Sequence, residues 1–103
     1  MRVAERGRDG FQRTVDEMLT AYGWRAYGVI DQERYARRTM KGFPDRFCWH
    51  PIKRRMLAIE VKGTGGKLSP EQKQYHAELR ECGLPVYTFW PETPQEEIEE
   101  VLR

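Results

Sequence analysis

The feature that most constrains the fold is a helix start placed between two strand-like segments. Ser69-Pro70-Glu71-Gln72 puts serine at the N-cap, proline at the first helical position and glutamine at the third, which is the pattern of a capping box. This predicts a helix that runs to about Cys82 and stops at Gly83. Segments 56–62 and 85–90 on either side are apolar and rich in β-branched or aromatic residues, which predicts strands. Strand, helix and strand in succession favour an α/β fold.

The remaining segments complete one predicted domain over residues 1–103. Five apolar residues recur at helical spacing before Gly23, where a left-handed helix cap is expected. These five are Phe11, Val15, Met18, Leu19 and Tyr22. We predict strands over 24–30 and 45–50, a long loop over 31–43 and a last helix opened by Thr93. The element order is α-β-β-β-α-β-α, and we expect a mixed central sheet flanked by helices.

Composition excludes several classes of protein. With 39% hydrophobic and 12% aromatic residues the chain is not disordered, and its apolar runs are too short to cross a membrane. The first residues lack the apolar stretch of a secretory signal. Cys48 and Cys82 are expected to be reduced, partly buried thiols, which favours a cytoplasmic location. Trp24, Trp49 and Trp90 lie on predicted strands, so we assign them to the core rather than to base stacking.

The net charge of +2 hides a strong polarisation along the chain. Segment 31–62 holds nine Lys/Arg against four acids, whereas segment 91–103 holds five Glu against one Arg. Such a chain can present a basic face to a polyanion, although an uneven solvated surface remains the alternative. The residues that we predict to contact DNA phosphates are Arg34, Arg37, Arg38, Lys41, Arg54, Arg55 and Lys67.

Three charged residues are predicted to meet at one edge of the sheet. Glu60 and Lys62 are two positions apart on a strand, so both side chains point to the same face, and Asp45 opens the neighbouring strand. Two carboxylates of this kind suit Mg²⁺ or Mn²⁺, while the ammonium can position water or neutralise developing charge. His50 and His76 each lack a second histidine at metal-ligand spacing. The alternative interpretation is an exposed strand-end pair beside an unrelated turn residue.

Strand register decides whether this site exists, because opposed residues of an antiparallel pair share a face. A register that points Asp45 to the face opposite Glu60 and Lys62 would break the site. A register shifted by one residue sets Asp45 directly opposite one of the two. We therefore expect a connection of even length, such as residues 51–54 or 52–55, or a bulge with the same effect.

Four sequence motifs in this order resemble the VRR-NUC branch of the PD-(D/E)XK nucleases. They are Gly42-Phe43-Pro44-Asp45, Ile59-Glu60-Val61-Lys62, Gly66-Lys67-Leu68-Ser69-Pro70-Glu71-Gln72 and Gly83-Leu84-Pro85-Val86-Tyr87. The resemblance covers the chain from about Phe11 to Leu102. It implies a restriction-endonuclease-like αβββαβ core with an extra C-terminal helix and a metal-dependent phosphodiesterase activity. Small stand-alone members of this kind are often phage or bacterial.

The resemblance also implies roles for individual residues. It makes Asp45, Glu60 and the main-chain carbonyl of Val61 metal ligands, and it makes Lys62 and Gln72 catalytic. Gln72 is also what the capping box requires, and the two roles are compatible. The family carries a further acid near the start of the first helix. We choose Asp9 as that ligand, and the alternatives are Glu5, Asp16 and Glu17.

The predicted function is hydrolysis of DNA by a Mg²⁺- or Mn²⁺-dependent endonuclease, on branched or structured DNA, as in a Holliday-junction resolvase. We expect a homodimer, because a symmetric pair of active edges suits a two-fold junction, and a bacterial or phage-infected cytoplasm. The alternatives are a catalytically silent nucleic-acid-binding domain and a nuclease that acts on RNA. Phosphate contacts do not distinguish these substrates.

Overall fold

A four-stranded mixed sheet forms the centre of the computed structural model, which describes residues 7–28 and 42–103. The elements are α2 (Arg8–Ala21), β1 (Arg25–Gly28), β2 (Arg46–His50), β3 (Arg55–Val61), α3 (Pro70–Glu81), β4 (Val86–Phe89) and α4 (Gln95–Leu102). The strand order is β1-β2-β3-β4, with β1, β2 and β3 antiparallel and β4 parallel to β3. The predicted element order and mixed sheet are confirmed. Predictions on Glu5, Arg34, Arg37, Arg38 and Lys41 fall outside the described residues.

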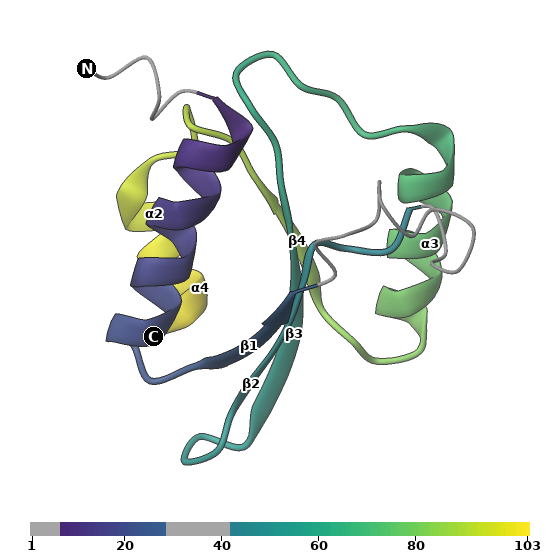
Figure 1. Ribbon diagram of the computed structural model, residues 1–103. Helices are drawn as coiled ribbons and strands as arrows, with labels where there is room; N and C mark the ends of the chain where they lie inside the picture. Colours follow the sequence, from purple (N-terminus) through teal and green to yellow (C-terminus); the bar gives the residue numbers. More distant parts are fainter. Residues whose placement is uncertain (1–6, 29–41) are drawn as a thin grey trace.

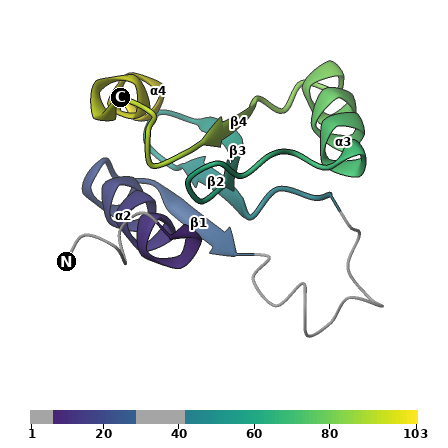
Figure 2. The same cartoon turned by 90° about the horizontal axis from the view of Figure 1, so that it is seen from above.

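Helices lie on both faces of the sheet. Figures 1 and 2 show α2 and α4 together on one face and α3 on the other. The first face carries the core, in which α2, α4 and the strands bury apolar side chains together. The core residues are Phe11, Val15, Leu19, Trp24, Cys48, Leu57, Ile59, Val61, Phe89, Ile98 and Leu102. The amphipathic stripe predicted for α2 is therefore the surface that this helix buries.

Two local signals define how the helices end and begin. Gly23 adopts a φ of +88° after α2, and a Cβ there would lie 2.9 Å from the Nε2 atom of His50, so glycine is required for both reasons. At α3 the predicted capping box is present. The Ser69 hydroxyl accepts from the Gln72 N–H at 3.1 Å, and the Gln72 Oε1 atom accepts from the Ser69 N–H at 2.8 Å.

The β2–β3 hairpin has the register that the site needs. Arg46 pairs with Ile59 and His50 pairs with Arg55, which leaves residues 51–54 as a four-residue connection. Continued by one residue, this register sets Asp45 opposite Glu60. The connection closes through the Arg54 N–H, which donates to the His50 carbonyl at 2.8 Å, with Arg54 at a φ of +58°. The predicted even length is confirmed.

Two residues that the sequence predicts to be buried, Trp49 and Cys82, are exposed in the structure. Trp24 is buried, and its Nε1 atom donates to the Leu102 carbonyl at 2.8 Å, but Trp49 is 38% exposed. Trp49 lies on the α3 face of the sheet, and α3 packs against β4, two strands away from β2. Cys82 is exposed at the end of α3, whereas Cys48 is buried, and both thiols are free.

Candidate active site

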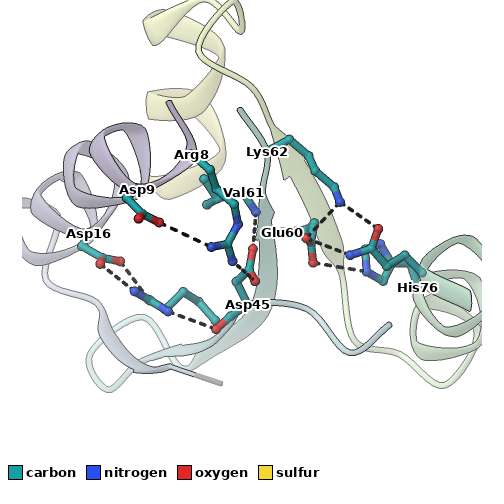
Figure 3. Close-up of polar contacts among 10 residues, drawn as sticks. Arg8, Asp9, Asp16, Asp45, Glu60, Val61, Lys62 and His76 are labelled. Atoms are coloured by element: carbon teal, nitrogen blue, oxygen red, sulfur yellow. Dashed lines mark hydrogen bonds and ion pairs between the residues drawn. The ribbon is translucent and has the colours of Figure 1, made fainter. Parts of the chain in front are cut away.

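Asp45 lies directly before β2 and is held through both oxygens of its side chain. Its side chain is 7% exposed, and its two carboxylate oxygens have different partners. The Oδ2 atom accepts from the Val61 N–H at 2.7 Å, which ties the carboxylate to the end of β3. The Oδ1 atom accepts from the Arg8 Nη2 atom at 2.7 Å, at the start of α2. Figure 3 shows the carboxylate between these two donors.

Glu60 lies on β3 and is 2% exposed. Its Oε2 atom accepts from the Gln72 Nε2 atom at 3.0 Å and lies 3.5 Å from the Lys62 Nζ atom. Its Oε1 atom is buried without a hydrogen-bond partner among the described residues. The pKa of Glu60 is raised to about 7, first by burial and then by the Asp45 carboxyl, while the Lys62 ammonium opposes both effects.

Gln72 connects the helix start to the charged residues. Its Oε1 atom accepts both from the Ser69 N–H and from the Lys62 Nζ atom, each at 2.8 Å, while its Nε2 atom donates to Glu60. One amide therefore caps α3 and fixes the geometry of the Glu60 carboxylate on β3 and of the Lys62 ammonium directly after it. Lys62 is half-buried, so its ammonium is held in place by this contact and by Glu60.

The donor set of this site fits a hard divalent cation. Glu60 Oε1 is a buried carboxylate oxygen without a hydrogen-bond partner among the described residues, and the negative charge of Asp45 is near enough to raise the pKa of Glu60. Carboxylate oxygens are the ligands that Mg²⁺ and Mn²⁺ prefer. In the described ranges no three His, Cys, Asp or Glu residues are placed so that they could together hold a metal ion, so a cation here would use Asp45, Glu60 and other oxygen donors. The Val61 carbonyl and Asp9 as further ligands stay predictions.

The described N-terminal acids, Asp9, Asp16 and Glu17, make no hydrogen bond or ion pair with either carboxylate of the site. The Asp9 side chain is 92% exposed and lies 3.6 Å from the Nη1 atom of Arg8. Asp16 accepts from Arg46 at 3.0 and 2.9 Å through both of its oxygens, and Glu17 is exposed. Arg8, rather than an acid, is the residue that α2 brings to Asp45.

Sequence reasoning missed Arg8 and His76. Arg8 is 37 positions from Asp45, and only the docking of the first turn of α2 brings them together. This turn lies close to the chain after β3, because a Cβ on Gly63 would lie 3.1 Å from the backbone nitrogen of Arg8. His76 is fully buried on α3, with its Nε2 atom 3.8 Å from the Glu60 Oε1 atom. Burial, with the charges of Arg80 and Lys62, lowers the pKa of His76. The only available signal was the position of His76 one helical turn after Gln72.

Replacing Arg8 tests whether its guanidinium competes with a bound cation. We expect Arg8→Gln to bind Mn²⁺ about fivefold more tightly without DNA, because a partly exposed ion pair is worth about 1 kcal/mol. Calorimetric titration of the metal into the protein measures this. The matched control is Arg13→Gln, an exposed arginine on the same helix, which should leave the affinity unchanged. An unchanged or weaker affinity in Arg8→Gln would contradict the competition.

The predicted phosphate-binding residues have different surroundings. Lys67 is exposed in the segment between β3 and α3, and Arg54 is exposed in the β2–β3 connection. Arg55 donates to the carbonyls of Arg103 and Val101 at 2.8 and 3.0 Å and lies over the Trp24 ring, so it packs α4 onto the sheet. A contact of Arg55 with DNA would require these bonds to break.

The arrangement of sheet and helices matches that of a solved VRR_NUC domain. That structure superposes with a TM-score of 0.69 at 21% identity, over 92% of each chain. The family profile of the VRR-NUC domain matches residues 13–89, which include Asp45, Glu60, Lys62 and Gln72. The chain belongs to the VRR-NUC domain family.

Two curated relatives share a shorter stretch with this chain. They are the Fanconi-associated nuclease 1 homologues of Caenorhabditis elegans and Caenorhabditis briggsae, each 38% identical over 48 residues. The matched stretch is 47% of this chain but 6% of each relative, so the chain spans a small part of the length of either protein. None of the described helices is long and apolar enough to span a membrane.

Proposed function

We propose that this chain is a divalent-metal-dependent endonuclease that hydrolyses phosphodiester bonds in DNA, with branched or structured DNA as substrate, in a bacterial or phage-infected cytoplasm. The observation that carries the proposal is a cluster at one end of the sheet, in which Gln72 joins Glu60 to Lys62 and the Val61 N–H holds the Asp45 carboxylate. Membership of the VRR-NUC domain family supports it, as do relatives that are named nucleases.

Each residue of the cluster has a defined task in this proposal. Asp45 and Glu60 would hold the metal, and the Val61 N–H fixes the orientation of the Asp45 carboxylate. The chemistry supplied there would be polarisation of the phosphodiester and a lower pKa of a water molecule. The Lys62 ammonium, held by Gln72, lies where it can orient the attacking water or neutralise charge that develops in the transition state.

The experiment that tests the proposal compares DNA structures and metals. Linear duplex, flapped duplex, four-way junction and single-stranded RNA are each incubated with Mg²⁺, with Mn²⁺ and with chelator. We expect metal-dependent cleavage of the branched substrates, lost in chelator. Binding without cleavage under every condition would favour the silent binding domain, and cleavage of RNA alone would favour the RNA alternative. Sedimentation with and without a junction tests the proposed homodimer.

The salt dependence of binding tests the basic residues. Replacing Arg54 and Lys67 by Gln should each reduce the slope of log affinity against log salt by about one, because each phosphate contact releases about one counterion. The measurement is fluorescence anisotropy of a junction in chelator across a salt series. Arg13→Gln serves as the control and should leave the slope unchanged. Unaltered affinity and slope in both variants would mean that these side chains face away from DNA.

A further inference from the structure

A group of large apolar side chains is exposed on the α3 face of the sheet. Tyr27 is 66% exposed, Trp49 38% and Met56 57%. The register places them together, because Tyr27 pairs with Phe47 and Trp49 pairs with Met56. The rings of Phe47 and Trp49 have centroids 6.0 Å apart at an angle of 37°. We call Tyr27, Phe47, Trp49 and Met56 the aromatic surface.

The aromatic surface is continuous with the candidate active site. Alternate residues of a strand point to the same face, so Phe47 and Trp49 form one row along β2, with about 7 Å between them, and Asp45 directly precedes the strand at the Phe47 end of this row. Figure 1 shows α3 over one end of this face, with the β2–β3 hairpin extending beyond it. The end that α3 covers contains Glu60 and His76, and the end beyond it contains Trp49 and Met56.

Positive charges border the aromatic surface on two sides. Arg25 is exposed and pairs with Trp49, so it lies in the same row of the same face. Lys53 and Arg54 are exposed in the connection that follows His50, at the end of β2 beyond Trp49. Aromatic rings with cations beside them are the usual surface for unpaired nucleic acid, in which bases stack and phosphates meet the cations. A purely apolar protein contact gains nothing from this arrangement of charge.

We propose that the aromatic surface binds unpaired bases of the nucleic acid that the active site cleaves. Trp49 and Tyr27 provide the stacking rings, Phe47 supports Trp49, and Arg25 contacts the backbone. The row along β2 then leads a single-stranded segment directly to Asp45. This inference rests on the proposed function, since it assigns the surface to the substrate of the same site.

Ring-selective substitutions at Trp49 test the proposal. Trp49→Leu keeps an apolar side chain but removes the ring, whereas Trp49→Phe keeps a ring. Anisotropy of labelled oligo(dT) in chelator measures binding without cleavage. We expect Trp49→Leu to weaken oligo(dT) binding roughly ten- to hundredfold, the range for loss of one base–aromatic stack. Trp49→Phe should stay close to the wild type, as should Ile52→Ala, the control for an exposed apolar residue in the hairpin connection.

A second variant, Tyr27→Leu, keeps the test valid if Trp49→Leu is poorly folded. Tyr27 lies on the edge strand and is more exposed than Trp49, so Tyr27→Leu is the variant to use if Trp49→Leu melts early. It should likewise weaken oligo(dT) binding. Circular dichroism confirms that each variant is folded.

Four results would overturn the inference. The first is wild-type affinity for oligo(dT) in both ring-removing variants, and the second is an equal loss in Ile52→Ala. The third is a wild-type dimer that dissociates in Trp49→Leu, because a second copy of the chain would then cover the surface. Cleavage of junctions by a protein with no affinity for oligo(dT) would overturn this inference alone. Ring-dependent oligo(dT) binding without any cleavage would instead support it and contradict the proposed function.

Discussion

Lys62→Met should reduce DNA cleavage by about a hundred- to a thousandfold while metal and DNA affinity stay close to those of the wild type. The ammonium is held by Gln72 Oε1 at 2.8 Å, so it is positioned to act in the transition state, where loss of one aligned donor has an effect of this size. One charge among many contributes little to DNA affinity.

Single-turnover cleavage and anisotropy in chelator separate the two effects of Lys62. The matched control is Lys73→Met, the same exchange at an exposed lysine of α3. Unchanged turnover in Lys62→Met would mean that Lys62 only forms an ion pair with Glu60 and takes no part in cleavage. Equal losses of turnover and of DNA affinity would make it a phosphate-binding residue.

Glu60→Gln should remove metal binding and lower cleavage by about a thousandfold or more, in keeping with a metal-assisted hydrolysis. The amide keeps the size of the carboxyl group but carries no charge for the cation. Mn²⁺ titration and cleavage assays measure the two losses. Glu100→Gln, an exposed glutamate on α4, is the matched control. Full metal affinity in Glu60→Gln would contradict the assignment of Glu60 as a ligand.

The same variant should also change how stability depends on pH. In the metal-free fold the pKa of Glu60 is raised from 4.5 to about 7, so the folded state binds more protons than the unfolded chain between these values. The free energy of unfolding in chelator should therefore fall as the pH rises from about 5 to about 8. Mg²⁺ should restore stability near pH 8. The free energy of unfolding of Glu60→Gln should depend less on pH than that of the wild type. Denaturant titrations at several pH values check this, and a wild-type stability that rises over the window would contradict it.

Much of the fold follows from signals that act over a few residues. The Ser69 capping box and the glycine after α2 depend on neighbours within one helical turn, so the sequence predicts them correctly. The hairpin register was predictable for another reason. Side chains alternate along a strand, which leaves two choices, and only one of them joins Asp45 to Glu60.

The rest of the site depends on how whole elements dock. Nothing near Arg8 in the sequence predicts its bond to Asp45, because the packing of α2 against the sheet creates that contact. The surroundings of Trp49 were misjudged for the same reason. An apolar residue on a strand is buried only if a helix covers that part of the face, and α3 packs over β4 instead.

The double use of Gln72 makes the first turn of α3 and the Lys62 ammonium one cooperative unit. If that turn frays, the Oε1 atom loses the Ser69 N–H and the Lys62 ammonium loses its restraint in the same event. Local openings of this kind need less free energy than global unfolding. Hydrogen exchange at the Gln72 amide should therefore report the fraction of molecules in which the lysine is free. That fraction should grow with temperature before the sheet melts. Heating should therefore abolish the activity expected of this site while the sheet is still folded.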